Sequence, residues 1–154
     1  MTMGMTVFVL QLGAADFNDK AVCLGPQIAT VLETLIDFPE LSEAAWYAVW
    51  VDAMGASPDV IAAMKHYEGS DERSIPDIRS FIAMSRTVTQ FLSGVFFGVP
   101  ANQPPELSDG IDQASDVLAL NGLVEVRAED TTFIEVVTAR SAIYQRFLGK
   151  TLAG

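Results

Sequence analysis

Some segments of the chain have the hydrophobic period of a helix and others the period of two of a strand, and the order of these segments limits the folds that the chain can adopt. After Gly25-Pro26, apolar residues recur every three or four positions until Pro39, which is typical of a helix that buries one face. Proline suits the first helical position and interrupts a helix later on. The positions on this face are Ile28, Val31, Leu32, Leu35 and Ile36.

A period of two dominates a later part of the chain. Segments 123–128 and 131–138 are both rich in strand-forming residues, and only the polar pair Glu129-Asp130 separates them. In the second segment, apolar side chains alternate between the two sides of an extended chain. The pattern predicts an antiparallel hairpin, although its turn lacks the glycine that tight hairpin turns favour.

Capping and turn residues place the other elements. Ser57-Pro58 and the Ser74 to Asp77 spacing are typical of helix starts, and Ser93-Gly94 indicates a break. The predicted strands are 5–12, 46–53, 95–99, 123–128 and 131–138. The predicted helices are 25–38, 58–67, 75–91 and 139–148. Residues 101–119 stay unassigned.

This order predicts one α+β domain over residues 5–149. Helices and strands are interspersed, but the last three strands follow one another without a helix. We therefore expect a mixed or antiparallel sheet of about five strands with helices packed mainly on one face; a doubly wound α/β fold is the alternative. The predicted core residues are Val7, Val9, Leu32, Ile36, Trp46, Trp50, Phe81, Val88, Phe96, Val124, Ile134 and Phe147.

Charge excludes several kinds of partner. The 154 residues include 20 acidic and 9 basic side chains, a net charge of −11. Nucleic acid and anionic membranes attract basic surfaces, so neither is an expected partner. No apolar run is long enough to cross a bilayer. One cysteine excludes an internal disulfide, which agrees with an expected cytoplasmic location. A half-hydrophobic composition also allows a homo-oligomer.

Common catalytic motifs are absent, and no cofactor is expected. The sequence contains no nucleophile elbow, phosphate-binding glycine loop or zinc-binding pattern. His66 stands near a predicted helix end, where a cation stabilises the helix, and is read as a local stabiliser rather than a catalytic base. Cys23, between Val22 and Leu24, is read as a small buried hydrophobe.

Two sets of carboxylates are candidates for a site. Asp109, Asp112 and Asp116 would share one face if their segment is helical, as an acidic binding surface or, alternatively, a site for a hard cation. Asp52 lies in an aromatic strand, on the face predicted for Trp46, Ala48 and Trp50, and is the carboxylate at risk of burial. If it is buried, it must be paired, with Arg86 and Arg127 available, or carry a raised pKa. Either set would suit a small carboxylate-dependent enzyme.

Three segments resemble a class of small bacterial proteins. They are residues 46–53 (WYAVWVDA), 80–99 (SFIAMSRTVTQFLSGVFFGV) and 124–137 (VEVRAEDTTFIEVV). Together they resemble small acidic immunity-type proteins that are encoded beside polymorphic toxins. The resemblance implies a stoichiometric inhibitor that binds a basic toxin domain, and it transfers no functional residue. A non-catalytic protein-binding domain is therefore the leading hypothesis; a small enzyme or metal-binding protein and a subunit of a homo-oligomer remain alternatives.

Overall fold

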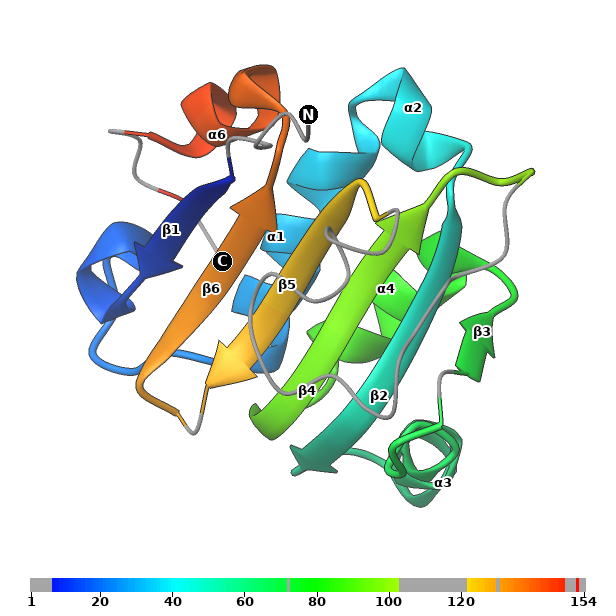
Figure 1. The fold of residues 1–154 in the computed structure, drawn as a ribbon. Helices are drawn as coiled ribbons and strands as arrows, with labels where there is room; N and C mark the ends of the chain where they lie inside the picture. The colour runs from blue at the N-terminus through cyan, green and yellow to red at the C-terminus, as the bar shows by residue number, and fades with distance from the viewer. Residues whose placement is uncertain (1–6, 72, 103–121, 130, 149–151, 153–154) are drawn as a thin grey trace.

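The computed structural model, which describes residues 7–71, 73–102, 122–129, 131–148 and 152, has a six-stranded antiparallel sheet in the order β1-β6-β5-β4-β2-β3 (Figure 1). The strands are β1 Phe8–Leu12, β2 Ala45–Met54, β3 Arg73–Ile75, β4 Gln90–Val99, β5 Val124–Glu129 and β6 Phe133–Thr138. The helices are η1 Ala14–Phe17, α1 Gly25–Ile36, α2 Pro39–Ser42, α3 Pro58–Lys65, α4 Ile78–Arg86 and α6 Ser141–Phe147. The α+β prediction is confirmed; every pair of described strands is antiparallel, which excludes the doubly wound alternative.

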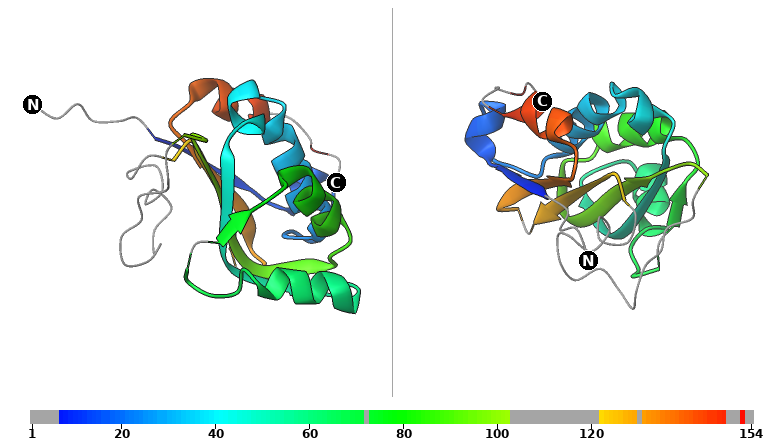
Figure 2. Two further views of the ribbon diagram at one scale, coloured as in Figure 1. Left: turned by 90° about the vertical axis from the view of Figure 1, so that its right-hand side faces the viewer. Right: turned by 45° about the horizontal axis from the view of Figure 1, so that its top comes forward.

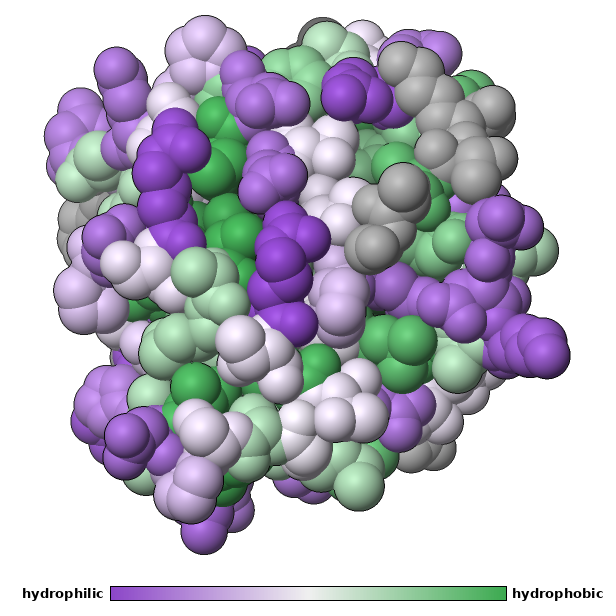
Figure 3. All heavy atoms as spheres, turned by 180° about the vertical axis from the view of Figure 1, so that it is seen from behind, coloured by the Kyte–Doolittle hydropathy of each residue, from purple (hydrophilic) through white to green (hydrophobic). Residues whose placement is uncertain are grey.

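Helices α1 and α4 cover one face of the sheet, and the main core lies between them and the strands (Figure 2). The five stripe positions of α1 are all buried, as the periodicity predicts. Gly25 lets the two helices approach closely, because a Cβ at this position would collide with the carbonyl oxygens of Ser85 and Val88. Viewed from the helix side, hydrophilic side chains cover much of the surface around smaller apolar areas (Figure 3).

The predicted hairpin is confirmed. Strands β5 and β6 pair from Val124 opposite Thr138 to Glu129 opposite Phe133. The turn closes with a 2.8 Å hydrogen bond from the Thr132 amide to the Glu129 carbonyl, and Thr131 takes a φ of 59°. Strand β1 then pairs antiparallel with β6, so the two ends of the chain meet in one sheet.

Helix α4 is shorter than predicted and β4 is longer. The helix ends at Arg86 instead of continuing to about residue 91, and β4 begins at Gln90 rather than at 95. Pairing with distant segments decides this, since the Thr89 amide donates to the Gly55 carbonyl and the Phe91 amide to the Cys23 carbonyl. Ser93-Gly94 therefore lies within a strand and does not break a helix.

The predicted capping pair Ser74 and Asp77 divides between two elements. Ser74 belongs to β3, a strand the sequence pattern missed, and Asp77 alone is the N-cap of α4. The Asp77 carboxylate accepts hydrogen bonds from the Ser80 hydroxyl at 2.8 Å and the Arg79 amide at 3.0 Å. The bond from Ser80 is the main cause that lowers the Asp77 pKa below its ordinary value.

A bulge in β2 reverses the predicted alternation of its side chains. The pairing with β4 shifts register between Val49 and Asp52, and Trp50 has a φ of 51°. Val51 is thereby buried in the core beneath the helices, while Trp50 packs against Val49 and neighbouring residues of the opposite face. The prediction that Trp46, Ala48, Trp50 and Asp52 share one face is wrong beyond Ala48.

Nine of the twelve predicted core residues are buried. The exceptions are Val7 and Trp50, which are half-buried, and Val9, whose side chain is 49% exposed. Val9 is exposed because β1 is an edge strand and this side chain points away from the helices. That opposite face of the sheet also carries a second group of buried apolar side chains, Val49, Val95, Phe97 and Val99.

We predict that Leu32→Ala lowers the free energy of unfolding by ~2–5 kcal/mol, since Leu32 is fully buried on the core side of α1. Glu33→Ala on the same helix is the control. It removes only an exposed ion pair with Arg86 and should cost under ~1 kcal/mol in the same denaturant titration. A cost for Leu32→Ala as small as that of the control would contradict the proposed core.

Candidate functional site

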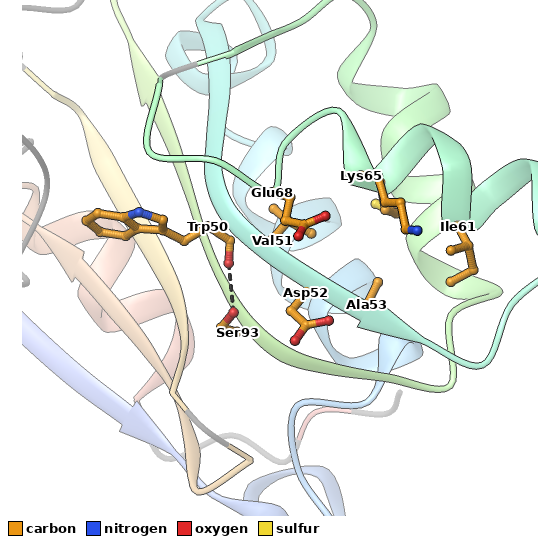
Figure 4. Close-up of a pocket in the computed structure, with 9 residues that line it drawn as sticks. Trp50, Val51, Asp52, Ala53, Ile61, Lys65, Glu68 and Ser93 are labelled. Atoms are coloured by element: carbon orange, nitrogen blue, oxygen red, sulfur yellow. Dashed lines mark hydrogen bonds between the residues drawn. The ribbon is translucent and has the colours of Figure 1, made fainter.

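A hollow lies beside the end of β2. It has a volume of about 520 Å³ and combines apolar walls with polar groups from four different elements (Figure 4). Asp52 comes from β2, Lys65 from α3, Glu68 from the loop after α3, and Ser93 from β4. The remaining lining residues are Trp50, Val51, Ala53, Ile61 and Met64.

Helix α3 is held beside this hollow by its two ends. At the start, the Ser57 side chain accepts a 3.3 Å hydrogen bond from the Val60 amide, as an N-cap does. At the end, Met64 is buried, and Tyr67 packs edge-on against Phe81 with ring centroids 5.6 Å apart. Burial also raises the pKa of the Tyr67 phenol. These contacts fix the position of the helix relative to β2.

Hydrogen bonds from outside the strand ladder stabilise the bulge. The Trp50 amide donates to the Gly69 carbonyl, and the Val51 amide donates to the Tyr67 carbonyl, both at 2.9 Å. From the other side, the Ser93 hydroxyl donates to the Trp50 carbonyl at 2.7 Å. A positive φ is unfavourable for a bulky residue, so these bonds offset a local strain at Trp50. The Trp50 ring points away from Lys65 and Ile61 (Figure 4).

The surface around α3 carries uncompensated negative charge. We define the α3 surface as Asp52, Asp59, Glu68 and Asp71, all of which are exposed. Within the described residues, none of these four carboxylates lies within 4 Å of a basic nitrogen, although Lys65 belongs to the same region. The four acids outnumber the two bases of this part of the chain, Lys65 and Arg73, and make the local potential negative.

The acid-rich stretch of residues 33–72 is not uniformly negative in the fold. Glu33 pairs with Arg86 at 3.1 Å and Glu40 pairs with Arg140 at 2.7 Å, so distant arginines neutralise part of it. The acids of this stretch without an ion pair in the described residues are Asp37, Glu43 and the four of the α3 surface. Carboxylates in such a place accept hydrogen bonds from ammonium and guanidinium groups, which is the recognition chemistry that this arrangement can provide.

The structure describes only one of the two predicted sets of site residues. Asp109, Asp112 and Asp116 lie outside the described residues. Asp52 is described and is exposed, so the burial considered for it does not occur. It follows the bulge, which changes the side of the strand on which each side chain lies. Neither expected arginine pairs with it, because Arg86 binds Glu33 and Arg127 binds Glu125.

The histidine and the cysteine have structural surroundings. His66 is the C-cap of α3, exposed, with its ring edge-on to Tyr67 at 5.0 Å. Its predicted position at a helix end is confirmed. Cys23 is fully buried, as expected, and its thiol donates a 3.3 Å hydrogen bond to the Phe133 carbonyl. In the part of the chain that the structure describes, no three His, Cys, Asp or Glu side chains group as metal ligands would.

The sequence reasoning missed a buried ion pair on the sheet face opposite the helices. Arg127 and Glu125 are two positions apart on β5 and therefore point to the same side, where Nε and Oε1 are 2.6 Å apart. Glu135 lies opposite Arg127 on β6 and accepts a 3.3 Å hydrogen bond from Gln11. The sequence signal for this ion pair was the presence of opposite charges two positions apart in a predicted strand.

Comparison with protein families, with curated proteins and with solved structures finds no significant match to this chain. Among the helices in the described ranges, none has the length and apolar character needed to cross a bilayer.

We predict that Ser93→Ala destabilises the fold by ~0.5–1.5 kcal/mol, the ordinary cost of one lost hydrogen bond, because it removes the bond to the Trp50 carbonyl. Ser42→Ala is the matched control, since its hydroxyl bonds the Pro39 carbonyl at an exposed site. Urea titration of both variants measures the difference. Equal, negligible costs would show that the bulge does not depend on Ser93.

Proposed function

We propose that the chain is a non-catalytic protein-binding domain of the immunity type, which inhibits a basic protein by binding it through the α3 surface. The observation that carries this proposal is that Asp52, Asp59, Glu68 and Asp71 are exposed without an ion pair in the described residues and border or flank one hollow, whereas Glu33 and Glu40 are paired with arginines. The proposed partner is a toxin domain with a basic surface, and the proposed place of action is the cytoplasm.

The hollow suits a long basic side chain. Val51, Ala53 and Ile61 provide apolar walls for the methylene groups of a lysine or arginine, and Asp52 and Glu68 provide carboxylates for its charged end. Arginine is the better fit for paired carboxylates, because its planar head makes several hydrogen bonds in fixed directions. Lys65 of the chain itself lines the same hollow and would be displaced toward solvent by such a ligand.

The negative potential supports fast binding more than tight binding. Complementary charges raise the rate of encounter and select among partners, while affinity depends on the buried centre of the interface. An inhibitor that must intercept a toxin benefits from a high association rate. The resemblance to immunity-type proteins supports the inhibitor role, although it transfers no residue of the site.

The experiment uses the full chain and the product of the neighbouring gene, with association followed by stopped-flow fluorescence at several salt concentrations. We predict that Asp52→Lys with Glu68→Lys slows association at least ~10-fold, within the range that electrostatic steering supplies. Raising salt should slow the unaltered chain too, because the Debye length falls from ~10 Å at 0.1 M to ~3 Å at 1 M.

The matched control is Asp37→Lys with Glu43→Lys, which makes the same charge change at exposed positions outside the α3 surface. The decrease in the logarithm of the association rate constant should be less than half of the decrease caused by Asp52→Lys with Glu68→Lys. Reversal of Asp109, Asp112 and Asp116 tests the acids first predicted from the sequence. A larger effect there, or equal effects everywhere, would remove the α3 surface as the guiding feature, and failure of the two proteins to bind would overturn the proposed partner.

A further inference from the structure

The two edges of the sheet differ in how well they are protected against further pairing. Strand β3 is three residues long, begins with the exposed Arg73 and is followed by Pro76, which are features that discourage another strand from adding. Strand β1 has five residues, FVLQL, without a charge or a proline. Its register against β6 is continuous from Phe8 to Leu12, with no bulge.

Within the described ranges, the outer side of β1 presents an open row of backbone groups. Among the described residues, no backbone hydrogen bond joins Phe8–Leu12 to any segment other than β6. The side chains of Val9 and Gln11 are exposed. An uncharged, regular edge strand of this kind is a template for one more antiparallel strand.

Apolar side chains are exposed on both sides of this edge. Three large hydrophobic residues of the described chain are markedly exposed. Two of them lie here: Val9 in β1 is 49% exposed, and Leu148, directly after α6, is 44% exposed. Helix α6 contacts β1 through Tyr144, whose ring stacks on Phe8 with centroids 4.9 Å apart. Figure 1 shows α6 beside β1 at this end of the sheet.

We propose that β1 pairs antiparallel with β1 of a second copy about a two-fold axis, so that two sheets join into one. An axis through Leu10 pairs all five residues and places Val9 opposite Gln11 of the partner subunit. A two-fold contact must be self-complementary, and an uncharged strand meets this condition without bringing like charges together. The interface is independent of the function proposed above.

Charge favours a second copy at this edge over a foreign strand. A chain with a net charge of −11 repels itself unless the contact avoids its acids. Neither β1 nor α6 contains an acidic residue, and α6 contributes Arg146. Five strand spacings of ~4.8 Å separate β1 from β3, which is about three Debye lengths at physiological salt. A basic partner would instead be drawn to the α3 surface, at the other side of the sheet.

The test is the mass of the full chain in solution by sedimentation equilibrium across a range of concentrations. We expect a reversible dimer, twice the chain's 16.6 kDa. Val9→Lys should raise the dimer dissociation constant at least ~10-fold, because lysine on an edge strand opposes further pairing. Met54→Lys, at a residue that is 47% exposed near the end of β2, makes the same change in charge and should leave the constant unaltered.

Hydrogen exchange keeps the proposal testable if Val9→Lys also weakens folding. In the unaltered chain, amides of Phe8–Leu12 that face outward should exchange more slowly as concentration rises toward the dimer. A monomer at every concentration would overturn the proposal. So would a dimer that Met54→Lys disrupts as strongly as Val9→Lys, or one that leaves exchange in β1 unchanged.

Discussion

The antiparallel pairing of β2 with β4 is the interaction on which the rest of the structure depends. These strands stand between β3 on one side and β5, β6 and β1 on the other, and they supply Trp46, Ala48 and Phe96 to the core under the helices. The same pairing shifts register between Val49 and Ala53, and this irregularity interrupts the alternation of side chains in β2. The pairing of β2 with β4 therefore contributes to both the core and the candidate site.

The strained bulge at Trp50 determines where the next side chains of β2 lie. The φ of Trp50 is unfavourable, and this strain is offset by the hydrogen bonds that the Trp50 and Val51 amides donate to the Gly69 and Tyr67 carbonyls and by the bond that the Ser93 hydroxyl donates to the Trp50 carbonyl. In return, Val51 enters the core and Asp52 is turned to solvent beside Lys65 and Glu68. A regular strand would have left the aromatic ring on the helix side and no hollow of this shape. The charge of the α3 surface then follows from which acids the distant arginines do not reach.

What the sequence predicted correctly was decided locally. The stripe of α1 and the alternation of β5 and β6 are properties of a few adjacent residues, and both are confirmed. The end of α4 was not predictable this way, because Val88 and Phe91 continue its apolar spacing while their backbone bonds belong to other segments. The ion pair of Glu33 with Arg86, 53 positions apart, and the bulge at Trp50 likewise depend on contacts that no local pattern reports. Accordingly, the acidic character was foreseen but its location at α3 was not.

The central claim is that the α3 surface is where a basic protein binds. It is tested most directly by amide NMR of the labelled full chain, titrated with the product of the neighbouring gene. The account predicts that the largest shift changes fall on Asp52, Glu68 and Asp71 and on the amides of α3, and that they shrink as salt is raised. Changes centred instead on β1 and α6, or shifts at α3 that are indifferent to salt, would contradict it.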